Sequence, residues 1–138
     1  MKFKFLEHTA DIKFQAFGSN KEEVFENSAL AMFNAMSHDI IKSRIKKKIS
    51  VKGKDNESLL YNFLEELLIL FDSEGFFLSK LKVKIKENKE KKLEAEVYGD
   101  SAENYNLRID IKAVTYNEMF IKKDNKTNKW VAQVVLDV

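Results

Sequence analysis

The chain of 138 residues contains no cysteine, no proline, four glycines and only two arginines, Arg44 and Arg108. Without cysteine it can form neither a disulfide framework nor a thiolate metal site. The glycines, at positions 18, 53, 75 and 99, match neither a Walker loop nor a dinucleotide-binding fingerprint. No nucleophile elbow is present either. These absences exclude several common enzyme classes and leave few motifs that could carry catalysis.

Long apolar runs are also absent. A membrane-spanning helix needs about 20 consecutive apolar residues, and no segment of the chain approaches that length. The first residues, 1–7, alternate charged and apolar side chains, which is typical of a strand and not of a signal peptide. Because neither an export signal nor a membrane span is found, we expect a cytoplasmic protein with no membrane partner.

The composition is that of an ordinary globular protein, with 44% apolar and 33% charged residues. The length fits a single domain over residues 1–138. A net charge of +2 argues neither for nor against a nucleic-acid partner. Nearly all of the basic residues are lysines, whereas arginine is preferred where phosphate is held by two hydrogen bonds. A lysine cluster in this chain is therefore weak support for phosphate binding.

Two helices are predicted from apolar spacing and capping residues. The first begins at Ser19, which forms a capping box with Glu22, and ends near Ser37. The second begins at Asp55 or Asn56 and ends before Gly75, a natural C-cap.

The other apolar segments alternate with polar residues and predict strands. These segments are residues 3–7, 12–17, 45–51, 81–85, 93–98, 107–114, 119–122 and 130–136. Hairpin-length links join most of them. We therefore predict an α+β fold of two layers, a largely antiparallel β-sheet covered by two α-helices on one side.

The turn His8-Thr9-Ala10-Asp11 is the first candidate site. It brings an imidazole, a hydroxyl and a carboxylate to a corner between two strands. A turn of this kind also forms where an aspartate simply accepts hydrogen bonds from nearby backbone N–H groups. The residues alone leave both interpretations open.

The C-terminus is the second candidate, because the Asp137 side chain and the main-chain carboxylate of Val138 are neighbours. Converging carboxylates suit a hard cation such as Ca²⁺ or Mg²⁺. Zinc is disfavoured, since only His8 and His38 could supply nitrogen. The alternative is a frayed tail, although the apolar residues 131–136 predict a core strand that would hold it in place.

Two lysine-rich segments, 42–54 and 80–86, could attract phosphate. A solvated strand face is the plainer interpretation, because no aromatic residues interleave with these lysines as a stacking platform would require.

Five segments, in this order, resemble the archease family. Residues 5–12, Phe-Leu-Glu-His-Thr-Ala-Asp-Ile, are very similar to its opening motif, and residues 57–72 are similar to its second helix. Residues 98–100, 111–116 and 134–138 supply the remaining three segments. The resemblance therefore covers the whole chain.

This resemblance implies a non-catalytic partner of the RtcB-type tRNA-splicing RNA ligase. Such a protein promotes guanylylation of the ligase and its multiple turnover, broadens its nucleotide use beyond GTP, and meets tRNA exon halves indirectly through the ligase. The resemblance also implies a divalent cation, with Ca²⁺ expected and Mg²⁺ or Mn²⁺ as alternatives. Its ligands would be Asp11, Asp137 and the terminal carboxylate of Val138, while His8 and Thr9 shape the turn.

Three positions depart from the family pattern. Asn117 follows Tyr116 where histidine is expected, Asp100 replaces a commoner glutamate, and Glu65 replaces an asparagine. We therefore assign no site role to Asn117, Asp100 or Glu65.

Two other functions remain open from the sequence. The protein could be a chaperone or specificity factor for an RNA-modifying enzyme, such as a tRNA methyltransferase, acting through its lysine-rich faces. It could also be an autonomous metal-dependent hydrolase, for which His8 is the one plausible general base near the carboxylates.

Overall fold

The computed structural model describes all of residues 1–138. It contains two α-helices, α1 (Lys21–Met36) and α2 (Asn56–Glu74), and one turn of 3-10 helix, η1 (Ala102–Asn104). The strands are β1 (Phe3–Leu6), β2 (Ile12–Gly18), β3 (Ile45–Gly53), β4 (Phe76–Glu87), β5 (Lys91–Ser101), β6 (Ala113–Lys123) and β7 (Trp130–Asp137). The α+β class predicted from the sequence is confirmed.

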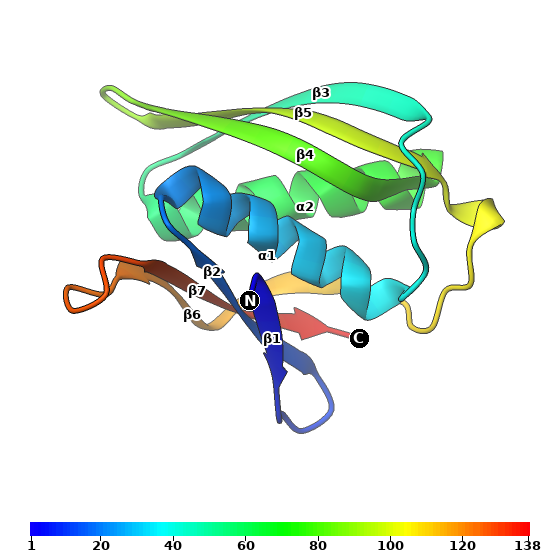
Figure 1. The fold of residues 1–138 in the computed structure, drawn as a ribbon, viewed down its shortest axis with the longest axis horizontal. Helices are drawn as coiled ribbons and strands as arrows, with labels where there is room; N and C mark the ends of the chain where they lie inside the picture. The colour runs from blue at the N-terminus through cyan, green and yellow to red at the C-terminus, as the bar shows by residue number, and fades with distance from the viewer.

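The strands form two sheets, and the helices lie between them (Figure 1). One sheet has the strand order β1-β2-β7-β6 and the other the order β3-β5-β4. All neighbouring strands are antiparallel, as predicted. The predicted two layers are corrected to three, since both helices have a sheet on either side. Alternation of apolar residues indicates that a strand has one buried face, but it does not tell which strands share a sheet.

The helices are buried over most of their circumference because both sheets cover them. In α1, neighbouring positions on different sides are buried together, such as Val24 with Phe25 and Met32 with Phe33. A helix that is apolar nearly all round belongs in an interior. Phe33 packs edge-on against Phe77 of β4, with ring centroids 5.1 Å apart. The core therefore fills the space between the two sheets.

Helix α1 begins one residue later than predicted. Its N-cap is Asn20, whose side chain accepts a hydrogen bond from the Glu23 N–H at 2.8 Å. Ser19 instead donates its backbone N–H and its hydroxyl to the Glu23 carboxylate. The predicted box of Ser19 with Glu22 is therefore wrong, because two capping residues stand side by side and the sequence does not rank them.

The ends of α2 are those predicted. Asp55 is the N-cap and forms a reciprocal capping box with Ser58. Gly75 is the C-cap, in the left-handed conformation with φ of 66°. Neither helix combines the length and the hydropathy that a membrane-spanning helix requires.

Residues 107–112 are not a strand, contrary to the prediction. Ile111 is buried and Ile109 is partly buried against the core. The backbone N–H of Arg108, however, donates to the carbonyl of Met36 at the end of α1, at 2.7 Å. The alternating pattern is thus produced by a loop that packs across the helix end and has no partner strand at that point.

Candidate functional site

The two predicted carboxylate side chains lie where β2 begins and β7 ends. In the β2–β7 ladder, Ile12 is opposite Leu136. Asp11 immediately precedes this ladder, in a bend, and Asp137 is the last residue of β7, so the two residues lie at the same end of the β2–β7 pair. Because Leu136 points into the core, the next residue of β7, Asp137, lies on the outer face of the four-stranded sheet. The Asp11 carboxylate lies 3.8 Å from Nδ1 of His8.

The end of the chain is held in place. Asp137 is paired with Ala113 of β6, and its carbonyl accepts a hydrogen bond from the Lys112 N–H at 2.8 Å. Val138 is partly buried and packs against the core. The prediction that a core strand would hold the tail is confirmed, and the frayed tail is excluded.

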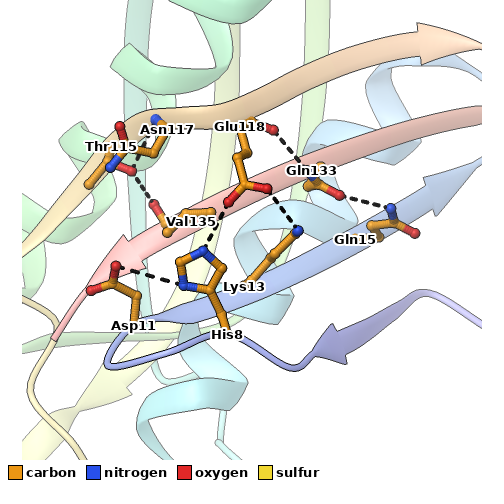
Figure 2. A network of polar contacts seen from close by, with 9 residues as sticks. All are labelled: His8, Asp11, Lys13, Gln15, Thr115, Asn117, Glu118, Gln133 and Val135. Carbon is orange, nitrogen blue, oxygen red and sulfur yellow. Dashed lines mark hydrogen bonds and ion pairs between the residues drawn. The ribbon is translucent and has the colours of Figure 1, made fainter.

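His8 connects the first turn to β6. Its Nε2 lies 2.9 Å from Oε2 of Glu118, and its Nδ1 lies 3.8 Å from Oδ2 of Asp11 (Figure 2). This Nδ1 is buried and has no hydrogen-bond partner. Ala10 takes a left-handed conformation, with φ of 67°, which a non-glycine residue adopts only at some cost. The turn thus holds the imidazole between two carboxylates.

A large irregular bulge in β6, of several residues, brings Glu118 to this position. Thr115 pairs with Val135 and Phe120 with Gln133, so residues 116–119 face only one residue of β7. Glu118 has a positive φ of 53° inside this segment. Bulges commonly redirect a side chain at a functional site, and here the Glu118 carboxylate is turned across the sheet toward His8.

Side chains on the outer face of the sheet fix the bulge. Gln133 donates to the Glu118 carbonyl at 2.8 Å and accepts a hydrogen bond from Gln15 at 3.0 Å (Figure 2). Thr115 donates to the Val135 carbonyl at 2.8 Å. These bonds satisfy polar groups that the interrupted ladder would otherwise leave unpaired.

The Glu118 carboxylate is stabilised in its charged form. Hydrogen bonds from His8 and from Lys13, at 3.1 Å, hold the pKa of Glu118 below its ordinary value, and the charge of Lys13 adds to the effect. This end of the four-stranded sheet therefore carries three acidic side chains, Asp11, Glu118 and Asp137, with Lys13 beside Glu118.

No group of three or more histidine, cysteine, aspartate or glutamate side chains is arranged to hold a metal ion. The ligand set expected from the family resemblance contains only two such side chains, Asp11 and Asp137, and is completed by the main-chain carboxylate of Val138. It therefore stays a prediction.

Asp100, one of the departures from the family pattern, lies away from this site. It is on β5 in the other sheet and is 3% exposed. Its carboxylate accepts hydrogen bonds from the Tyr105 hydroxyl at 2.7 Å and the Ser101 N–H at 2.8 Å, and it pairs with Arg44 at 3.3 Å. These contacts hold the chain around η1, which is a structural role.

The whole chain can be compared with known proteins on the basis of this fold and site. Residues 3–138 match the model of the Archease protein family. The chain belongs to the archease family. The resemblance noted in the sequence is thereby confirmed.

Archease relatives match this chain end to end. It is 39% identical to the protein archease of Pyrococcus abyssi, over 99% of both chains. It is 42% identical to that of Methanosarcina barkeri, over 99% of this chain and 96% of the relative. The solution structure of protein 1598 of Methanobacterium thermoautotrophicum has 34% identity and a TM-score of 0.82, with 99% of both chains covered. The fold described above is thus shared by this family.

Sequence reasoning missed the contribution of β6 to the site. Glu118 and Gln133 are separated from His8 by more than 100 residues along the chain. The nearest sequence feature is the segment 111–116, which resembles the archease family and ends two residues before Glu118. It is followed by Asn117, where the family pattern has histidine. A bulge has no simple sequence pattern, so neither residue could be placed beside the first turn.

Proposed function

We propose that this protein is a non-catalytic activator of an RtcB-type tRNA-splicing RNA ligase. It promotes guanylylation of the ligase and its multiple turnover, and it broadens the nucleotides that the ligase accepts. The observation that carries the proposal is membership of the archease family over nearly the whole chain. It is supported by the position of Asp11 and Asp137 at the same end of the β2–β7 pair. The ligase is the partner, and tRNA exon halves are met through it.

A divalent cation fits the chemistry of this end of the sheet. Asp11 and Asp137 lie at the same end of the β2–β7 pair, and the family resemblance adds the main-chain carboxylate of Val138 as a third ligand. Oxygen donors of this kind favour Ca²⁺, with Mg²⁺ or Mn²⁺ as alternatives. When bound, such a cation supplies positive charge that offsets the charge of phosphate oxygens.

The residues around the carboxylates position them and do not react. His8 fixes the first turn through Glu118, and the Lys112 N–H fixes the backbone of Asp137. The outer face of this sheet is not covered by either helix (Figure 1). It is therefore available to dock at the mouth of the ligase active site and to orient the carboxylates there.

The protein is proposed not to be an enzyme in its own right. His8 is the only candidate general base beside the carboxylates. Its Nε2 is bound to Glu118 at 2.9 Å, and its other nitrogen, Nδ1, is buried and out of reach of a substrate in solution. Purified protein should therefore hydrolyse no phosphoester in the absence of the ligase.

Calcium titration tests the cation site. Asp11→Asn should weaken Ca²⁺ binding by about 100-fold or more, since loss of even an outer-shell partner costs about 10–100-fold. Asp124→Asn, in the turn at the other end of β7, is the matched control and should leave the affinity unchanged. Calorimetric titration of the metal-free proteins makes the measurement. Equal affinities for wild type and Asp11→Asn would rule out this site.

A ligation time course with the ligase limiting tests the activator role. Product should continue to accumulate beyond one turnover only when the protein is present. Asp11→Asn should remove this effect, and Asp124→Asn should retain it. If Asp11→Asn activates the ligase as well as wild type does, the carboxylate cluster is not required for activation.

A further inference from the structure

The outer face of the three-stranded sheet is strongly basic. Side chains at every second position point away from the helices: Lys80 to Lys86 on β4, Lys46 to Lys52 on β3, and Lys92 to Tyr98 on β5. These three rows contain eight lysines and two glutamates, Glu94 and Glu96. Neither helix nor the other sheet covers this face (Figure 1).

The charge is segregated and does not follow from the lysine content alone. The whole chain has 24 basic and 22 acidic residues. Removing the eight lysines and two glutamates of this face leaves 16 basic and 20 acidic residues. The rest of the molecule is therefore net negative, while this one face has a formal excess of six positive charges. A compositional bias would have spread the lysines over all surfaces.

Most of these lysines are free to bind a ligand. Lys46, Lys52 and Lys92 form ion pairs with glutamates at 3.3–3.4 Å. The remaining five, which are Lys48 and the four on β4, have no ion pair. All five are exposed, so their charges are directed to solvent.

The shape of the face is a shallow trough. Residues of the three strands, among them Lys48, Lys82 and Lys84, line a hollow of about 520 Å³. Same-face residues of a strand are about 6.7 Å apart, so the four lysines of β4 form a row of about 20 Å. The β3 lysines form a second row about 9.5 Å away, because β5 lies between them. Two parallel rows of cations suit a linear chain of anions.

We propose that this face binds the phosphate backbone of RNA without reading its sequence. Lysine acts as a point charge toward phosphate, whereas base recognition and bidentate contacts favour arginine. The proposal goes beyond activation of the ligase, but the choice of RNA over DNA rests on that proposed function.

An acidic protein surface fits the same face less well. Protein–protein interfaces are depleted in lysine and are anchored by buried aromatic residues or arginine. Tyr98 is the one aromatic residue in the three rows, and the ammonium groups of Lys46 and Lys80 lie 5.7 Å and 5.2 Å from its ring centroid. This face therefore offers a single, partly buried aromatic ring, whereas a base-stacking platform uses several rings on which successive bases stack.

Fluorescence anisotropy with a labelled oligouridine RNA tests the proposal. The strand should be longer than the site sizes of about 4–16 nucleotides known for single-strand-binding folds. Wild type should bind at about 50 mM salt, and its affinity should fall steeply as salt increases. Lys82→Gln/Lys84→Gln should weaken binding about tenfold or more and reduce the salt slope by about 1.4, because each phosphate contact on a single strand contributes about 0.7.

The matched control is Lys123→Gln/Lys126→Gln, which removes two exposed lysines from the β6–β7 hairpin. It should bind RNA nearly as well as wild type. All four lysines are exposed, so thermal melts should show folded variants. The assay contains no ligase, so loss of RNA binding and loss of activation are read separately.

Several outcomes would overturn the proposal. One is that wild type does not bind RNA at low salt. Another is that both double variants lose the same affinity, which is the result expected if net charge alone governs binding. Tighter binding to an acidic peptide or to phosphatidylserine vesicles would assign the face to another partner. A DNA strand of matching length should bind no more tightly than RNA, and tighter binding would contradict the choice of RNA.

Discussion

At the scale of single residues, His8 is the side chain that joins the two halves of the site. It lies on the turn before β2, yet its hydrogen bond is to Glu118 of β6. The sequence indicated that His8 shapes the turn, and the structure adds that it also fixes a distant bulge. The metal ligands expected from the resemblance depend on this support, since Asp11 is on the same turn.

The pKa of Glu118 tests this contact. His8→Ala should raise the pKa of Glu118 toward its ordinary value, because the hydrogen bond from His8 is the largest cause of its lowered value. Titration of the glutamate carboxyl signals by NMR makes the measurement. Lys123→Ala, far from the site, is the control and should leave the Glu118 pKa where it is. An unchanged pKa in His8→Ala would show that the contact is absent in solution.

The hydrogen bond between His8 and Glu118 also affects how the free energy of unfolding depends on pH. A carboxyl whose pKa is lower in the folded state stabilises the fold above its unfolded pKa, and this contribution is lost as the pH falls through the folded value. His8→Ala should therefore reduce the difference in unfolding free energy between neutral and acidic pH. The effect should be small, because the Glu118 side chain is 51% exposed and solvent screens its charge.

Individual site residues differ in how far sequence could predict them. Asp11 and Asp137 were singled out as carboxylates at a turn and at a strand end, and their assignment as ligands comes from the family resemblance and stays a prediction. Glu118 was not singled out, because its position depends on three extra residues in β6 that pairing alone reveals. Asp100 was set aside as a site residue, and its buried hydrogen bonds to Tyr105 and Ser101 now give it a structural role.

At the scale of elements, irregularities in the strands position the loops. In β4, Ser79 is an extra residue between Leu78 and Lys80, which pair with Gly99 and Tyr98. The Ser79 hydroxyl donates to the Ile41 carbonyl at 2.8 Å. This bulge therefore ties the segment between α1 and β3 to the three-stranded sheet. Neither bulge has a sequence signal as clear as the caps at Asp55 and Gly75, which were predicted.

Gly99 is required by the close approach of β4. A Cβ atom at this position would lie 2.0 Å from the Phe77 carbonyl oxygen, a backbone atom. Gly99→Ala should therefore destabilise the protein by about 3 kcal/mol or more, since overpacking of a rigid site costs about 1–3 kcal/mol even where the neighbours can move. Urea denaturation measures the loss.

Gly75→Ala is the matched control. The φ of Gly75 is 66°, but no atom lies within 4 Å of an added Cβ. Only the left-handed backbone is disfavoured, so the cost should be about 1 kcal/mol. Equal losses for the two variants would contradict the close approach at Gly99.

At the scale of the whole molecule, the three-layer arrangement separates two surfaces of different charge. The four-stranded sheet carries Asp11, Asp137 and Glu118 at one end, and the outer face of the other sheet carries the lysine rows. Alternation in the sequence predicted that the strands expose one face, within a single sheet. It could not predict that two such faces lie on opposite sides of the helices, because assignment of strands to sheets depends on long-range pairing. In the functions proposed above, one face would meet the ligase and the other would meet RNA.

Guanylyl transfer to the ligase tests the central claim most directly. Ligase that has completed one round of ligation is mixed with labelled GTP and a divalent cation, with or without this protein, and the label bound covalently to the ligase is followed over time. The account predicts rapid labelling with wild type and with Asp124→Asn, and slow labelling with Asp11→Asn or without the protein. Labelling at the same rate in all four mixtures would contradict it.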